Sequence, residues 1–163
     1  MDGNLPEGLG AYVEEKILPQ YRGSDPAHGE AHVRQVVKNC RELAEPLPVR
    51  WSLVYVAAAY HDLGIPFFGR KDHQLTSARL LREDRELKRW FTPEEVELMA
   101  QAVEDHRASG ETPPRSLYGR IVSEADRDLN PERIVQRCME YGKAHFPEKD
   151  PDWQIRRTVA HIG

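Results

Sequence analysis

Cysteine is scarce in this sequence of 163 residues, which contains only Cys40 and Cys138. The two lie far apart, each at an apolar position of an expected helix, so we interpret both as reduced core thiols and not as a disulfide framework. No apolar run approaches the roughly 20 residues that cross a bilayer, and the chain does not begin with a basic segment followed by an apolar one. We therefore expect a cytoplasmic protein with no membrane partner.

Charge of one sign is not in excess either, because 23 Lys and Arg residues are balanced by 27 Asp and Glu residues. This balance gives no reason to expect a double-stranded nucleic acid as a partner. Apolar residues make up 39% and charged residues 31% of the chain, as in an ordinary globular protein. The length suits one full hydrophobic core, so we expect a single domain over residues 1–163.

Sustained alternation of apolar and polar residues, which is typical of strands, is missing as well. Apolar residues recur instead at spacings of three and four, which predicts an all-α fold, a compact multi-helix bundle. The expected helices cover residues 6–18, 26–44, 49–62, 72–81, 92–110 and 116–129, and two more begin at Asn130 and Asp150 and pack on these.

Several local signals refine these boundaries. Asp72 and the capping box Thr92-Pro93-Glu94-Glu95 predict two helix starts. In the helix after Asp72, the spacing predicts that Leu75 faces the core. Residues 65–71, which include a proline and a glycine, are expected to form a loop.

Metal-capable side chains stand at a buried helix end. His61 and Asp62 close the apolar run 54–60 and are followed by Gly64. Adjacent residues diverge on a regular helix, but both side chains can turn toward one point where a glycine unwinds the last turn. The pair is therefore interpreted as two metal ligands.

Two further segments carry candidate ligands. Asp25 is expected to cap a helix in which His28 and His32 share one face, with His32 at the edge of the apolar stripe. Asp126 lies on the apolar face of a later helix, where an aspartate needs a strong partner. His32, His61, Asp62 and Asp126 would together form a site with nitrogen and oxygen ligands.

The order His, His-Asp, Asp on separate helices resembles the HD-domain superfamily of metal-dependent phosphohydrolases, and most of all its small stand-alone bacterial members. The resemblance covers roughly residues 25–129. It rests on the segment from His28 to Val36, on His61-Asp62-Leu63-Gly64, and on a shuffled match from Ile121 to Leu129. It implies metal ligation by His32, His61, Asp62 and Asp126. In two-metal branches, histidines in places like those of His73 and His106 help to hold a second ion.

Two imidazoles and two carboxylates suit a divalent ion such as Mn, Fe, Co, Ni, Zn or Mg, and leave positions for water and a phosphate oxygen. Taken with this ligand set, the resemblance implies hydrolysis of a phosphate monoester or diester, for example of a nucleotide, with one or two ions per chain. Asp62 would also help to deprotonate water, and His28 would orient a ligand or bind the leaving oxygen. Candidates for phosphate binding flank the ligands in sequence: Arg34, Arg70, Lys71, Arg107 and Arg127.

Other interpretations stay open. In the alternative interpretation, His106 is a hydrogen-bonded core histidine and His73 is a surface residue. Arg70 and Lys71 are then a solvated basic pair that does not contact substrate. At the level of function, the alternatives are a non-catalytic module that binds metal or a nucleotide, and an oxygenase with two irons. Iron content and oxygen consumption would identify the oxygenase, and stoichiometric binding without product would identify the module.

Overall fold

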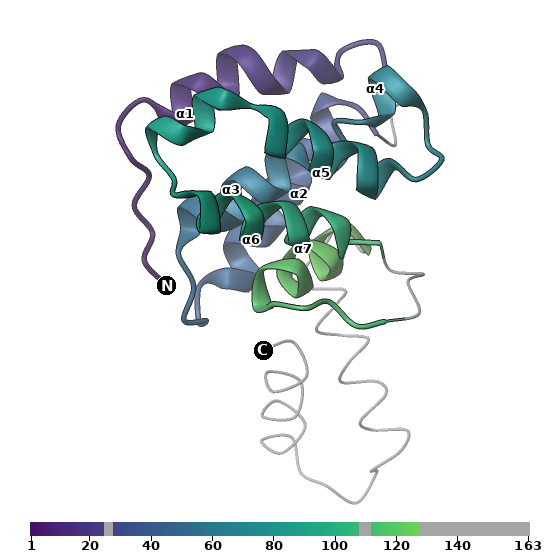
Figure 1. Ribbon diagram of the computed structural model, residues 1–163. Coiled ribbons are helices and arrows are strands. Elements are labelled where there is room, and N and C mark those ends of the chain that lie inside the picture. Colours follow the sequence, from purple (N-terminus) through teal and green to yellow (C-terminus); the bar gives the residue numbers. More distant parts are fainter. Residues whose placement is uncertain (25–27, 108–111, 128–163) are drawn as a thin grey trace, which may run out of the picture.

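The computed structural model describes residues 1–24, 28–107 and 112–127 of the chain. These residues contain helices and no strand, apart from one isolated bridge between Asp2 and Arg50, and this confirms the predicted all-α fold. The helices are α1 (Leu9–Tyr12), α2 (Glu30–Ala44), α3 (Trp51–Tyr60), α4 (Ile65–Phe68), α5 (His73–Glu83), α6 (Pro93–Glu104) and α7 (Leu117–Arg127), as labelled in Figure 1.

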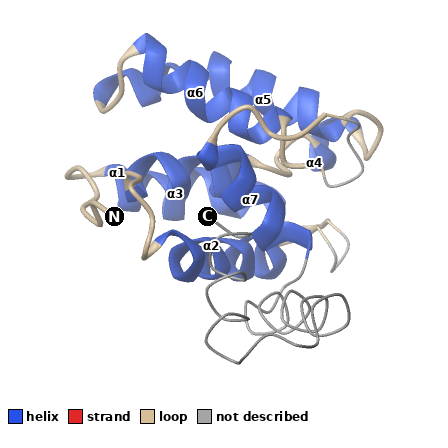
Figure 2. Ribbon diagram, turned by 90° about the horizontal axis from the view of Figure 1, so that it is seen from below, coloured by secondary structure: helices blue, strands red, loops and turns tan. Residues whose placement is uncertain are grey.

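Helix α3 is the centre of the bundle. All of its residues are buried, as the nearly uniform apolar run predicts. Figure 2 shows α5 and α6 side by side on one side of α3 and α2 on the other, and α7 packs against α2, α3 and α6. The small side chains of Ala57, Ala58 and Ala59 allow these neighbours to approach α3 closely.

The amino-terminal helix braces the bundle. It begins at Leu9 rather than at the expected Pro6, and continues past α1 as a π-helical segment, Val13–Ile17, and a 3₁₀ segment, Leu18–Tyr21. The Tyr21 hydroxyl donates a hydrogen bond of 2.6 Å to the carbonyl oxygen of Ala59 in α3. This bond ties the brace to the turn of α3 that precedes His61.

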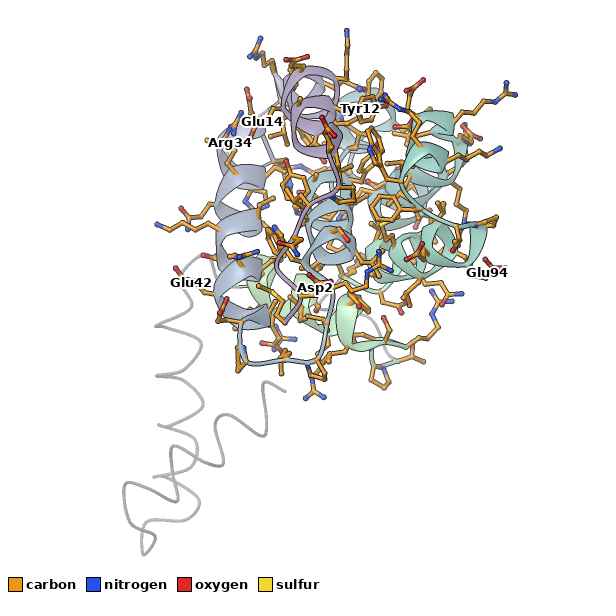
Figure 3. All side chains as sticks on the ribbon, turned by 90° about the vertical axis from the view of Figure 1, so that its left-hand side faces the viewer. Asp2, Tyr12, Glu14, Arg34, Glu42 and Glu94 are labelled. Carbon is orange, nitrogen blue, oxygen red and sulfur yellow. The ribbon has the colours of Figure 1, made fainter. Side chains whose placement is uncertain are left out.

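An ion pair ties the same segment to α2. The Arg34 guanidinium donates two hydrogen bonds, of 3.0 and 2.7 Å, to the Glu14 carboxylate. Figure 3 shows these two labelled side chains pointing toward one another between the brace and α2. Both are about half exposed, so we expect the pair to contribute little to stability.

The predicted capping box of α6 is confirmed. The Glu95 amide donates a hydrogen bond to Thr92 Oγ1 at 3.2 Å, and the Thr92 amide donates one to Glu95 Oε1 at 2.9 Å. The helix is shorter than expected, since it ends at Glu104 and not near residue 110.

Other local predictions were wrong. Residues 65–68 form the short helix α4 inside the expected loop. Asp72 precedes α5 with a left-handed backbone (φ 54°) and makes no side-chain capping bond. Leu75 is exposed, because no described element covers that face of the first turn of α5.

The start of α2 also differs from the prediction. The helix begins at Glu30 after Gly29, whose extended backbone (φ −85°, ψ −175°) separates His28 from the helix. The two histidines therefore do not share a helical face. The proposed Asp25 cap, Leu129, Cys138 and the helices expected in 130–163 lie outside the described residues, whereas Cys40 is a buried free thiol.

Candidate metal centre

In the described part of the chain, five helix ends supply a cluster of side chains that could hold metal. His32 lies in the first turn of α2, and Asp126 lies in the last turn of α7. The remaining ligand candidates stand at other helix ends: His61 and Asp62 just after α3, His73 at the first residue of α5, and His106 just after α6. Because these elements pack around α3, side chains that are far apart in sequence meet at one place.

A first group of four potential ligands faces a common point. His32 Nε2 lies 3.0 Å from Asp126 Oδ1 and 3.5 Å from Asp62 Oδ2. His61 Nε2 lies 3.4 Å from Asp62 Oδ2 and 3.5 Å from Asp126 Oδ1. Two ligand atoms on one ion are about 3.0 to 3.4 Å apart when each bond is about 2.1 Å long, so the spacing fits a divalent cation.

A second group adjoins the first through Asp62. The other carboxylate oxygen of this residue, Oδ1, lies 3.5 Å from His73 Nε2 and 3.6 Å from His106 Nε2. His106 Nε2 also lies 3.9 Å from Asp126 Oδ2. One carboxylate thus faces two groups of histidines, one with each oxygen.

Three of the histidines are held in the same way by backbone. The Nδ1 of His61 bonds to the Ala58 carbonyl at 2.6 Å, and that of His106 to the Val103 carbonyl at 2.6 Å. His73 Nδ1 bonds to the Arg70 carbonyl at 3.0 Å. A carbonyl oxygen only accepts, so each Nδ1 carries the hydrogen and a neutral ring has its lone pair on Nε2, the atom that faces the carboxylates.

Several atoms at the centre of the cluster have no hydrogen-bond partner. They are His61 Nε2, His106 Nε2 and Asp62 Oδ1, and all three are buried. Leaving a polar atom buried and unpaired costs about 1 to 3 kcal/mol. A histidine that serves only the core would have both nitrogens paired, so the unpaired Nε2 of His106 favours a ligand role.

The carboxylates of Asp62 and Asp126 make positive charge favourable at the centre of the cluster. Burial opposes protonation of His61, but the charges of Asp62 and Asp126 outweigh it and raise its pKa well above the ordinary value. Burial alone would raise the pKa of both carboxyl groups, yet the surrounding histidines hold the pKa of Asp62 and of Asp126 far below their usual range. A divalent cation bound here would supply this charge and release the protons.

His28 reaches the cluster in spite of its place before α2. Its Nδ1 lies 3.2 Å from Asp62 Oδ2, and the side chain is partly exposed. His28 therefore sits between the shared carboxylate and the outside of the protein. In this position, His28 can orient Asp62 and can also contact a molecule that enters the site from solvent.

The predicted phosphate-binding residues are placed less clearly. Arg34 is held by the carboxylates of Glu14 and Glu30, whose hydrogen bonds raise its pKa, so its charge is already balanced. Arg127 lies 3.5 Å from Glu124. The side chains of Arg70, Lys71 and Arg107 are exposed. Their role in phosphate binding stays a prediction.

Sequence reasoning missed the contact that fixes the turn after Asp62. The Gly64 amide donates a hydrogen bond of 2.8 Å to Ser77 Oγ in α5. Gly64 has an ordinary helical backbone (φ −67°), and a Cβ atom on it would lie 2.0 Å from Thr76 Oγ1. The glycine is thus needed for close packing and not to unwind α3, which already ends at Tyr60; no sequence signal marks this role.

The fold and the cluster define an all-helical domain with a group of histidine and aspartate side chains that could hold a divalent metal ion. The model of the HD domain family matches residues 29–130, which is more than half of the chain. The protein therefore belongs to the HD domain family, whose members bind divalent metal ions. All four residues of the first group lie inside the matched range.

The chain is similar in structure to a protein from an uncultured Thermotogales bacterium, described as a "predicted HD superfamily hydrolase". The TM-score is 0.62 at 21% sequence identity, and the match covers 92% of this chain and 82% of the other. At this identity the likeness supports the fold. A search of curated proteins found no match. In the part of the chain that is described, no helix has the length and apolar character to cross a membrane.

Proposed function

We propose that this protein is a metal-dependent hydrolase of phosphate esters that uses two divalent ions. The observation that carries the proposal is the position of Asp62, whose two oxygens face separate groups of histidine nitrogens. A single ion does not explain why His73 and His106 are gathered and oriented by backbone on the far side of the same carboxylate.

Each side chain of the cluster has a proposed role in binding metal or substrate. His32, His61 and Asp126 would hold one ion, His73 and His106 the other, and Asp62 would bridge the two. The bound ions supply Lewis acidity, which lowers the pKa of a coordinated water and polarises the phosphoryl group. His28 keeps Asp62 oriented through Nδ1, and when its ring carries a second proton on Nε2 it can donate that proton to a leaving oxygen.

The proposal is tested by measuring metal content per chain and phosphate release with Mn, Fe, Co, Ni, Zn and Mg. Asp126→Ala should lose bound metal and phosphate release together. The matched control is Glu124→Ala on the same helix, because Glu124 is paired with Arg127 and not with the cluster. Wild type that binds no metal after all these ions have been supplied would contradict the proposal.

An oxygenase with two irons is a second candidate, because the same arrangement of imidazoles around a shared carboxylate suits iron. Iron as the ion retained on purification, with oxygen uptake and no phosphate release, would assign that function. A non-catalytic module is less well supported, since the ligand groups are complete. Stable metal binding without turnover of any phosphate ester would favour it.

A further inference from the structure

Exposed apolar side chains occur in the two helices that follow His61 and Asp62 in the chain. Among the residues described, four large apolar side chains are more than a third exposed: Phe67 (54%), Phe68 (49%), Leu75 (52%) and Leu5 (37%). The first three belong to α4 and the first turn of α5, which pack on each other (Figure 1). Exposed aromatic side chains gathered in one place are a common feature of ligand-binding surfaces.

These three exposed side chains are here called the α4 platform, defined as Phe67, Phe68 and Leu75. The rings of Phe67 and Phe68 are 6.4 Å apart and tilted by 51°. The Arg79 guanidinium lies 5.4 Å from the centre of the Phe68 ring, and Leu75 stands one helical turn before Arg79. Helix α4 buries none of its own residues, so the core does not require its phenylalanines.

The α4 platform is fixed relative to the metal centre. Gly64, the residue before α4, lies two residues after Asp62, and its hydrogen bond to Ser77 joins this turn to α5. The same helix begins with His73, whose Nε2 faces Asp62 Oδ1. One rigid joint therefore positions both the ligands and the aromatic side chains.

The chemistry around the α4 platform points to a ligand with a planar ring and negative charge. Arg79, which also pairs with Glu83 at 3.4 Å, lies over Phe68, and the basic residues Arg70 and Lys71 follow α4 in the chain. The adjacent cluster is suited to a phosphoryl group. Three half-exposed side chains offer only about 300 Å², well below the roughly 800 Å² per partner of a stable protein interface.

We propose that Phe67 and Phe68 determine substrate specificity by stacking against a planar ring of the phosphate ester, such as the base of a nucleotide, while its phosphate lies at the metal centre. This inference rests on the proposed function. Aromatic side chains stack on any base and give affinity without reading the hydrogen-bonding edge. The residues would therefore select for a planar ring and not for one particular base.

The test compares Phe67→Ala/Phe68→Ala with wild type and with Leu5→Ala, an exposed apolar residue outside the α4 platform. Each metal-loaded protein is assayed on a nucleoside monophosphate and on glycerol phosphate, which has no ring. Stacking on one base is worth about five- to hundred-fold in affinity. We expect the double variant to raise KM for the nucleotide about ten-fold or more, with kcat and the activity on glycerol phosphate unchanged.

Equal losses on both substrates, or no loss on the nucleotide, would overturn the inference and leave the hydrolase function standing. Sedimentation at several concentrations checks for a second copy on the α4 platform, and a wild-type dimer that the double variant abolishes would also overturn it. If wild type hydrolyses no ester, the proposed function fails by itself. In that case, the affinity for the nucleoside monophosphate is measured by calorimetry for wild type and for the double variant. Equal affinities of these two proteins would again exclude stacking.

Discussion

Among individual residues, His106 offers the most direct count of ions. Its Nε2 faces Asp62 Oδ1, the carboxylate oxygen turned away from His32 and His61, while its Nδ1 is fixed by the Val103 carbonyl. We expect His106→Gln to lower the metal content from about two ions per chain to about one and to keep the ion held by His32 and His61. Elemental analysis of the purified protein measures this.

A suitable comparison is His32→Gln, which removes a proposed ligand of the first group. If the second ion depends on the first through Asp62, this variant loses both ions, whereas His106→Gln loses one. Identical metal content in His106→Gln and wild type would show that the second group does not bind metal.

His28 gives a different kind of prediction, because it contacts Asp62 from the partly exposed side of the cluster. His28→Ala should retain the metal and lose about 100-fold in kcat, the lower range for removal of a group that assists proton transfer. Metal content and phosphate release are measured on the same sample. Loss of metal in parallel with activity would instead make His28 a ligand or a support for one.

Among the elements, the joint between α3, α4 and α5 is the most sensitive to substitution. A Cβ atom on residue 64 would lie 2.0 Å from Thr76 Oγ1 and 2.9 Å from the Ser77 backbone nitrogen. Gly64→Ala must therefore push α4 away from α5, and overpacking of this kind costs about 1 to 3 kcal/mol. Urea denaturation of the metal-free protein should show a free energy of unfolding lower by that amount.

Gly10→Ala is the matched control, since a Cβ atom there meets only Leu5 Cδ1 at 3.8 Å and residue 10 lies within α1. Its free energy of unfolding should stay the same or rise, because alanine favours a helix over glycine by about 1 kcal/mol. If Gly64→Ala and Gly10→Ala had the same free energy of unfolding, the contact between α4 and α5 would accommodate the added Cβ atom without loss of stability.

What the sequence could predict at this scale depends on how local the signal is. The capping box of α6 is contained in four adjacent residues, and Asp126 was found because the apolar period of α7 is regular. Leu75 satisfies the same period, yet it is exposed, since the period does not reveal whether a neighbour covers the helix. His28 was misplaced because the extended backbone of Gly29 ends the helix early.

At the scale of the whole molecule, the bundle brings carboxylate and imidazole groups together in one buried cluster. Whether a cation is bound decides how many of these histidines carry a second proton. Four histidine rings surround Asp62 within 3.6 Å of its oxygens, in addition to His28 at 3.2 Å. Without a cation, the carboxylates hold protons on the histidines, and the pKa of His32 and of His61 is raised against the opposing effect of burial. Metal binding and protonation therefore compete for the same nitrogens.

This competition predicts a pH dependence with a definite sign. The raised pKa of His61 stabilises the metal-free fold at pH values below about 6.5, and this contribution is lost as the pH rises through the higher folded-state pKa. Metal affinity changes in the opposite sense, since each displaced proton makes binding about ten-fold tighter per pH unit. Calorimetric titration with Mn or Zn between pH 6 and 8, in buffers of different ionisation enthalpy, measures affinity and protons released. An affinity independent of pH, with no proton release, would show that the histidines are already neutral in the metal-free protein.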